Sequence, residues 1–403
     1  MAFKVIINLF CLISRMVNEM HLKDCCTIIA GQSPESKYYN TDGIGLPFFQ
    51  GKADFGELYP TIRVYCSQPT KVAEKDDILL SVRAPVGPTN LAPCRVCIGR
   101  GLTAIRPSEV LLTRYVLLFF RYFEAQLASK GTGTTFKAIT QDIVKNLEIP
   151  IPPLSEQERI VTRIEELFSQ LDAGVETLQK AKAQLAVYRQ AVLKEALEGD
   201  YPRKQLKEFS KATGGYAFKS SKYTPDGNYI VVKIGNVKER RFDFSRDLTK
   251  TAEADDSILE KYLLQRGDCI ITLTGSRGKR DYGFVAMVTD QSNYLLNQRV
   301  AALRFDQSVA LPEFYQYYLA SPEYRDMFFS YETGNVGQGN VGIKALIDPV
   351  VILPDIEMQK KIVEEIESNL SVCDSIEQTV DTALQQAEAM RQSILKEAFS
   401  GSY

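Results

Sequence analysis

The chain has 403 residues, of which 45% are hydrophobic and 24% are charged, and its formal net charge is −2. This composition is that of a soluble globular protein with two or three domains, and the net charge excludes a uniformly basic nucleic-acid binder. The sequence contains no apolar run of 18 or more residues, so we expect no membrane span.

The first segment, residues 2–13, is apolar and could pass for a secretory signal peptide. Its basic region holds only Lys4, and no small-residue cleavage site follows cleanly. We therefore expect either a buried strand or an extension upstream of a true start at Met16 or Met20.

Eight cysteines are spread along the chain, and only Cys94 and Cys97 have the C-x-x-C spacing of half a zinc site or a redox pair. There is no second C-x-x-C, and His21 is the only histidine. We therefore expect reduced structural thiols, no bound metal and a cytoplasmic location. A zinc or redox enzyme built on these two cysteines is an alternative, which a metal assay and a test of thiol reactivity would decide.

Residues 20–152 contain short β-rich runs separated by Gly, Pro and Asn, which predicts a mixed α/β domain. A run at 78–82 follows an aspartate and leads into an arginine loop, and glycine-rich turns follow at 99–101 and 131–137. Arginine and lysine can donate two hydrogen bonds to guanine, and hydroxyl groups in glycine-rich turns suit phosphate oxygens. The candidate DNA-binding residues of this block are Arg83, Arg100, Thr134, Thr135 and Lys137.

Residues 153–201 have apolar residues seven apart, which predicts a long helix that packs along another helix. Two prolines and the capping-box pattern Ser155-x-x-Glu158 mark its start, and Gly199 marks its end. Taken alone, such a helix could simply dimerise or act as a spacer.

Residues 202–352 repeat the order of elements of the first block with different side chains. The run at 269–273 corresponds to 78–82, the turn at 297–299 to 99–101, and the segment at 334–340 to 131–137. Asparagine and glutamine add the pairing that matches adenine. The candidate DNA-binding residues of this block are Arg277, Lys279, Arg280, Asn297, Gln298, Arg299, Gln338 and Asn340.

Any one of these candidates, taken alone, is more typical of a solvated loop or a turn. Their grouping is what favours DNA binding, because the charge of the chain is unevenly spread. Residues 153–201 carry a net charge of −3 and residues 353–403 a net charge of −6, which leaves +7 on the rest. Positive charge is therefore concentrated in two blocks, as two separate phosphate-facing modules would require.

Residues 353–403 are a second copy of the long helix. Segment 189–201 recurs as 391–403 at an offset of 202 residues, and 18 of the 45 positions aligned without a gap from Gln157 and Gln359 onward are identical. A proline precedes Asp355, which is a plausible N-cap. The chain is therefore an internal duplication, each half being a domain followed by a helix.

This arrangement resembles the DNA specificity subunit of Type I restriction–modification systems, from about residue 20 to Tyr403. In the first half the resemblance rests on Gly31-Gln-Ser-Pro with Tyr38-Tyr39-Asn40, Phe48-Phe-Gln50-Gly51, Ser81-Val-Arg83-Ala-Pro-Val-Gly87, Thr135-Phe136-Lys137-Ala-Ile139 and Ile151-Pro-Pro-Leu-Ser-Glu-Gln157. In the second half it rests on Gly214-Gly-Tyr-Ala-Phe218-Lys219-Ser220 and Leu295-Leu-Asn-Gln-Arg299. The second helix start, Leu353-Pro-Asp-Ile-Glu-Met-Gln359, departs from the pattern because it lacks the double proline.

The resemblance implies an α+β fold with target recognition domains at 20–152 and 202–352, each reading one half of a split DNA site. It implies that the helices at 153–201 and 353–403 pair as an antiparallel coiled coil, act as a ruler and dock methyltransferase subunits. The implied partners are double-stranded DNA, methyltransferase (M) subunits and a restriction (R) subunit. S-adenosylmethionine, ATP and Mg would be bound by those partner subunits, and no cofactor by this chain.

Two catalytic motifs are absent from the sequence. There is no Asn-Pro-Pro-aromatic motif for adenine methylation and no G-x-x-x-x-G-K-[S/T] phosphate loop, so we expect a chain without a catalytic centre. Two other readings remain open. One is a coiled-coil scaffold with two modules that bind carbohydrate or protein. The other is the reading subunit of a restriction enzyme of another type.

Overall fold

The computed structural model describes residues 18–132, 138–252, 255–290, 293–335 and 337–399. It divides into two compact units. Unit 1 comprises residues 1–180 and 381–403, and unit 2 comprises residues 181–380. Two 44-residue helices, α5 (Leu154–Leu197) and α10 (Ile356–Phe399), contribute to both units.

Unit 1 is built on two sheets. The antiparallel sheet has the strand order β2-β10-β7-β8, formed by Cys26–Ala30, Leu102–Pro107, Ile78–Ser81 and Thr89–Leu91. The five-stranded sheet has the order β3-β5-β4-β9-β6, formed by Tyr39–Asn40, Tyr65–Cys66, Leu46–Phe49, Val96–Ile98 and Val72–Ala73. A separate pair joins β1 (Asn18–His21) to β11 (Glu148–Ile151). Strand β7 is buried on both faces, which explains its continuous apolar run.

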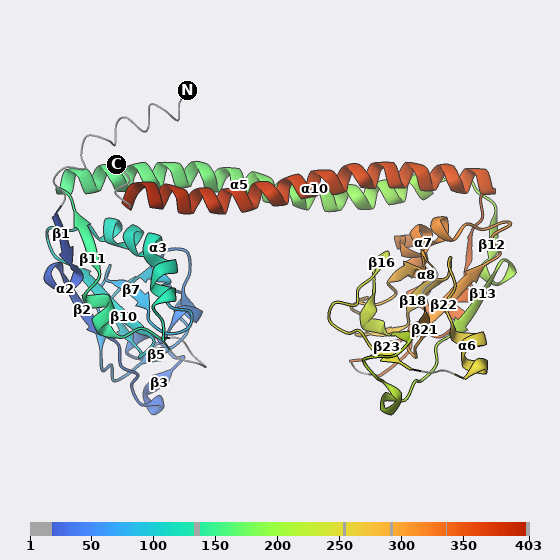
Figure 1. Cartoon of the computed structure of the whole chain (residues 1–403), viewed down its shortest axis with the longest axis horizontal. Helices are drawn as coiled ribbons and strands as arrows, with labels where there is room; N and C mark the ends of the chain where they lie inside the picture. Colours follow the sequence, from blue (N-terminus) through green and yellow to red (C-terminus); the bar gives the residue numbers. More distant parts are fainter. Residues whose placement is uncertain (1–17, 133–137, 253–254, 291–292, 336, 400–403) are drawn as a thin grey trace, which may run out of the picture. The chain divides into compact units, whose positions relative to one another are not determined.

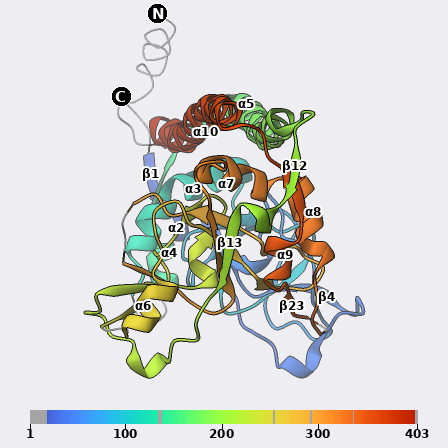
Figure 2. The same ribbon diagram turned by 90° about the vertical axis from the view of Figure 1, so that its right-hand side faces the viewer.

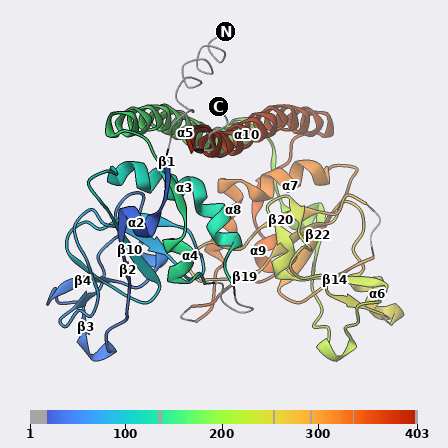
Figure 3. The same ribbon diagram turned by 60° about the vertical axis from the view of Figure 1, so that its left-hand side comes forward.

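The helices of unit 1 cover the antiparallel sheet. The short helices are α2 (Leu22–Cys25) and α4 (Gln141–Lys145), and the longest within the domain is α3 (Thr113–Ser129). Helix α3 lies between the long helices and the sheet, as Figure 3 shows, and buries Tyr115, Val116 and Phe119 in one core with Ile78 and Ile105. The domain and the long helices of unit 1 therefore share a hydrophobic core.

Unit 2 repeats this architecture. Its antiparallel sheet has the order β13-β22-β18-β20, formed by Ser210–Gly214, Val300–Phe305, Cys269–Thr272 and Val285–Met287. The three-stranded sheet has the order β17-β14-β21, formed by Lys250–Thr251, Tyr229–Val232 and Tyr294–Leu296. The two-stranded pairs are β12 with β24 (Arg203–Gln205, Val350–Ile352), β15 with β16 (Val237–Lys238, Arg241–Phe242) and β19 with β23 (Thr274–Gly275, Gly339–Asn340).

The helices of unit 2 are α6 (Asp256–Tyr262), α7 (Pro312–Ala320), α8 (Pro322–Ser330) and α9 (Lys344–Ile347). Helix α7 takes the place that α3 has in unit 1, beneath the long helices (Figure 2). Its side chains Phe314 and Tyr318 lie in one core with Ile271 and Leu303 of the sheet.

The long helices pair antiparallel in each unit (Figure 1). In unit 1, Leu395 and Phe399 near the end of α10 lie in one core with Ile164 and Phe168 near the start of α5. Arg391 forms an ion pair with Asp172 at the same place.

In unit 2, Leu193 and Leu197 of α5 lie in one core with Ile362 and Ile366 of α10. Arg189 bridges Asp374 and Glu377 at 2.6 and 2.9 Å. The predicted fold class, two mixed α/β domains with paired antiparallel helices, is confirmed.

The starts of the two long helices differ from each other. Asp355 caps α10, since its carboxylate accepts a hydrogen bond from the backbone N–H of Met358 at 2.8 Å, as predicted. The predicted capping box at Ser155 is wrong, because α5 already begins at Leu154. The Pro153 carbonyl accepts hydrogen bonds from Glu156 and Gln157 instead.

A buried glutamine ties each long helix to its domain. In unit 1 the Gln157 amide accepts a hydrogen bond from Leu112 N–H and donates to the carbonyls of Val110 and Pro152, each at 2.8 Å. In unit 2 Gln359 makes the same three bonds, with Leu311 N–H, Val309 C=O and Pro354 C=O at 2.7, 2.8 and 2.7 Å. Both side chains are fully buried. The first turn of each helix is thus fixed to two backbone segments of its own domain.

Candidate functional site

Three segments of unit 2 meet at one end of its antiparallel sheet. The turn at 297–299 is joined to the end of β18 by a hydrogen bond from Leu273 N–H to Arg299 C=O at 2.9 Å. The segment 333–341 joins the same strand end, because Val341 N–H donates to Leu273 C=O at 2.9 Å and β23 pairs with β19. Segments from three separate parts of the chain therefore form one surface.

This surface is hollowed into a cavity of about 610 Å³. Four of the predicted DNA-binding residues line it, namely Gln298, Arg299, Gln338 and Asn340. All four side chains are exposed. These four predicted residues give the cavity three amide side chains and one guanidinium group. Together they can donate and accept hydrogen bonds along the edge of a base.

Two residues that line the cavity have a positive backbone φ angle. Gly334 has a φ of +126°, and a Cβ atom there would lie 2.2 Å from the Gln338 carbonyl oxygen, so only glycine fits. Arg299 has a φ of +69°, a conformation that costs a non-glycine residue about 1–2 kcal/mol. Strained backbone of this kind is a feature that binding sites share.

The basic loop of residues 276–281 is largely engaged in contacts within unit 2. Arg277 donates to the Gly334 carbonyl at 2.6 Å and so braces one wall of the cavity. Arg280 pairs with Asp326 at 2.6 Å and lies over the Phe329 ring. Lys279 is exposed on the same loop. None of these three side chains lines the cavity itself.

Asn297 was predicted as a DNA-binding residue, but its side chain is buried with only 8% exposed. Its N–H donates to the Val232 carbonyl at 3.3 Å, and its side-chain oxygen has no partner among the described residues. Asn297 thus lies behind the turn, and Gln298 and Arg299 project from it.

Two polar side chains that line the cavity, those of Thr274 and Asn335, were not among the residues predicted from the sequence. The Thr274 hydroxyl donates to the side-chain oxygen of Asn340 at 3.1 Å and orients that amide. The signal that could have identified Asn335 is its place directly after a glycine in a polar turn.

In unit 1 the structure describes two of the five predicted residues. Arg100 is exposed at the tip of the turn 99–101, and its N–H donates to the Ser33 hydroxyl at 3.2 Å. Arg83 is exposed just after the end of β7, where its backbone pairs with that of Ala138 in an isolated antiparallel bridge. The other three predicted residues, Thr134, Thr135 and Lys137, lie outside the described residues.

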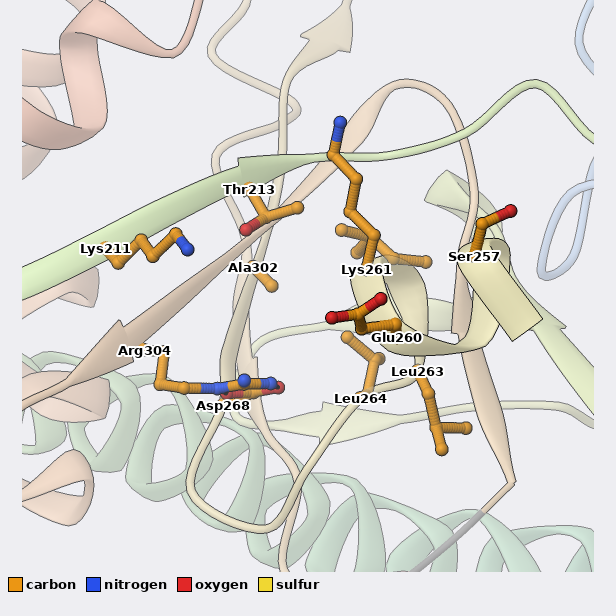
Figure 4. Close-up of a pocket in the computed structure, with 11 residues that line it drawn as sticks. Lys211, Thr213, Ser257, Glu260, Lys261, Leu263, Leu264, Asp268, Ala302 and Arg304 are labelled. Carbon is orange, nitrogen blue, oxygen red and sulfur yellow. Dashed lines mark hydrogen bonds and ion pairs between the residues drawn. The ribbon is translucent and has the colours of Figure 1, made fainter.

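A second cavity of unit 2, about 380 Å³ in volume, lies between the sheet and α6. Figure 4 shows Arg304 against Asp268, with Lys211, Glu260 and Lys261 around them. Arg304 donates two hydrogen bonds of 2.7 Å to the buried Asp268 carboxylate, which raise the pKa of Arg304. The residues that line this second cavity carry both acidic and basic groups and include none of the predicted DNA-binding residues. This cavity is therefore not the candidate site.

The alternative built on Cys94 and Cys97 gains no support from their surroundings. Burial raises the pKa of the Cys97 thiol to about 11, so this thiol is protonated at neutral pH and a poor nucleophile. Among the described residues, no three His, Cys, Asp or Glu side chains are grouped so that they could hold a metal ion. None of the described helices is long and apolar enough to cross a membrane.

Comparisons with known proteins bear on both units. The family profile described as Type I restriction modification DNA specificity domain matches residues 15–185 and again residues 198–386. A Methanocaldococcus jannaschii protein assigned as the MjaX specificity subunit of a type I restriction enzyme is 39% identical over 183 residues. That match covers 45% of this chain and 41% of the relative, so it spans less than half of that protein.

Two further matches are longer. The type I restriction enzyme EcoKI specificity subunit of Escherichia coli is 26% identical over 329 residues, which cover 77% of this chain and 69% of the relative. A solved structure concerned with complex assembly and conformational transition of the type I R-M system matches 96% of this chain and 98% of its own chain. Its TM-score of 0.75 at 19% sequence identity shows a shared fold. Because the family profile matches twice and covers most of the sequence, the chain belongs to the Type I restriction–modification DNA specificity family.

Proposed function

We propose that this chain is the DNA-reading subunit of a Type I restriction–modification system, with each unit reading one half of a split site in double-stranded DNA. The observation that carries this proposal is the cavity of unit 2, where exposed Gln298, Arg299, Gln338 and Asn340 converge. These residue types are the ones that pair with adenine and guanine edges. The family profile matches the first half of the chain as well as the second, which supports a second DNA-reading domain in unit 1.

The long helices supply the spacing between the two readers in this proposal. Each is one continuous helix of 44 residues, about 65 Å long at 1.5 Å per residue. A continuous helix pair that is fixed to each domain by a buried glutamine would hold the half-sites at a constant separation. Bases between the half-sites would then not need to be read.

The chain itself is proposed to be non-catalytic. It would direct methyltransferase (M) subunits and a restriction (R) subunit to the site, and S-adenosylmethionine, ATP and Mg would be bound by those subunits. The curated relatives are named as specificity subunits, which supports this division of labour.

The test is to co-express the chain with the methyltransferase subunit of its system and to map N6-methyladenine in the host DNA. We expect one split motif with a constant gap, which disappears when the gene for this chain is deleted. A direct binding assay at several salt concentrations accompanies it, since phosphate contacts make DNA affinity fall with salt. Methylation that survives the deletion, together with no salt-dependent DNA binding, would overturn the proposal and favour a scaffold whose modules bind other ligands.

A further inference from the structure

The turn 99–101 of unit 1 and the turn 297–299 of unit 2 are held by the same backbone hydrogen bonds. In unit 1 the bonds are Gly31 N–H to Leu102 C=O at 2.9 Å, Gln32 N–H to Ile98 C=O at 3.0 Å and Val82 N–H to Gly101 C=O at 3.0 Å. In unit 2 they are Gly215 N–H to Val300 C=O at 3.0 Å, Tyr216 N–H to Leu296 C=O at 3.0 Å and Leu273 N–H to Arg299 C=O at 2.9 Å. Arg100 and Gln298 therefore occupy the same position in the two units.

The third segment of the site is also equivalent. Ile139 N–H donates to Val82 C=O at 3.0 Å in unit 1, as Val341 N–H donates to Leu273 C=O in unit 2. The residues just before them close the segment by the bridges Thr132–Ala138 and Thr333–Asn340. The two units therefore share one frame of backbone hydrogen bonds, although Arg299 has a φ of +69° and Gly101, at the equivalent position, is not in the left-handed region.

The side chains at the turn and at the strand end differ in chemistry between the two units. Arg100 corresponds to Gln298, and the arginine of unit 2 is one residue later, at Arg299, where unit 1 has Gly101. At the strand end, unit 1 has Arg83 where unit 2 has Thr274. Unit 1 thus presents guanidinium groups where unit 2 presents an amide and a hydroxyl group.

Position 100/298 is the best placed of these to read a base. Both side chains are exposed at the tip of a turn whose backbone is pinned on either side. Both are long enough and have the paired hydrogen-bonding groups for a two-bond contact, arginine to guanine O6 and N7 and glutamine to adenine N6 and N7. Arg277 and Arg280, in contrast, are held by Gly334 and Asp326 within unit 2.

We propose that Arg100 and Gln298 are equivalent specificity-determining residues, and that Arg100 selects a guanine in one half-site while Gln298 selects an adenine in the other. This rests on the proposed function, since it assumes that both turns face DNA. It goes beyond that function because it assigns one base to one residue in each half-site. It also makes the two half-sites different in sequence although their readers share a backbone frame.

The test is the substitution Gln298→Arg in the full chain, assembled with its methyltransferase and assayed by methylation mapping and by competition binding. The competitor duplexes carry each base pair of each half-site replaced in turn. We expect one position of one half-site to change its preference from A·T to G·C by about 5- to 150-fold, which corresponds to one two-bond contact. The other half-site stays unchanged, and the reciprocal substitution Arg100→Gln has the opposite effect there.

A second variant, Gln298→Ala, tests the same position if arginine does not fit the turn. It should lose the discrimination between A·T and G·C at that single position. Lys207→Gln, an exposed charge change elsewhere in unit 2, is the control and should leave the motif unchanged. A folded Gln298→Arg or Gln298→Ala protein with an unchanged preference at every position overturns the inference, as does equal weakening at all positions. A wild-type protein that directs no split motif overturns the proposed function instead.

Discussion

Replacing Gln157 by alanine should destabilise unit 1 far more than its single polar side chain suggests. The side chain is fully buried, and its amide is the partner of three backbone groups, Leu112 N–H, Val110 C=O and Pro152 C=O. A buried backbone group left without a partner costs about 1–3 kcal/mol. Since part of this is recovered by relaxation around the cavity, we expect the free energy of unfolding to fall by about 3–5 kcal/mol.

The measurement is chemical denaturation followed by circular dichroism, because the chain has no tryptophan. Amide hydrogen exchange localises the effect, and the Leu112 amide should lose its protection while the Leu311 amide keeps it. Gln359→Ala should give the mirror result in unit 2, where the same three bonds are made. Gln170→Ala, an exposed glutamine on the same helix, is the control and should change stability by less than about 0.5 kcal/mol. A Gln157→Ala protein within 1 kcal/mol of that control, with a protected Leu112 amide, would refute the reasoning.

Three further results are expected. Burial raises the pKa of Glu124, so the folded state prefers the neutral carboxyl group and loses stability as the pH rises above the ordinary value of 4.5. Glu124→Gln should therefore be more stable than the wild type at pH 7 and no more stable at pH 4, and equal stability at both pH values would contradict this. Arg299→Ala should weaken binding about 5- to 150-fold through the half-site that unit 2 reads, and an equal loss for probes altered in either half-site would exclude its role. Insertion of four residues, about one helical turn, after Gln184 and after Gln386 should change the preferred gap between half-sites in methylation mapping, whereas an unchanged gap would rule out the ruler.

Most of the fold could be predicted because periodicity and duplication are visible without coordinates. The run predicted at 269–273 is β18 (Cys269–Thr272), and the heptad segments are α5 and α10. The cap at Ser155 was mispredicted because the sequence pattern does not fix the first helical residue, which is Leu154. Pro153 precedes that residue, and its carbonyl accepts the first hydrogen bonds of the helix, from Glu156 and Gln157.

The candidate site was less predictable, since the type of a residue does not reveal whether its side chain points to solvent or into the core. Gln298 and Arg299 line the cavity, but the neighbouring Asn297 faces inward because its backbone is paired with Val232. Arg280 has the right chemistry for DNA, yet the structure pairs it with Asp326 on α8, a partner 46 residues away in sequence. Contacts between distant segments decide such cases, and a single sequence does not contain them.

The duplication separates two kinds of residue that respond differently to substitution. Gln157 and Gln359 make equivalent contacts in the two units, so both stabilise the fold. Replacing either one should lower the free energy of unfolding. Arg100 and Gln298 sit at equivalent points of the shared backbone frame with different chemistry, so exchanging them leaves the backbone contacts in place. Under the proposed function, such a division would let one domain acquire a new half-site by changing exposed turn residues, while the buried glutamines keep each helix fixed to its own domain. Substitutions at the turns should accordingly change which bases are methylated without changing the gap between half-sites.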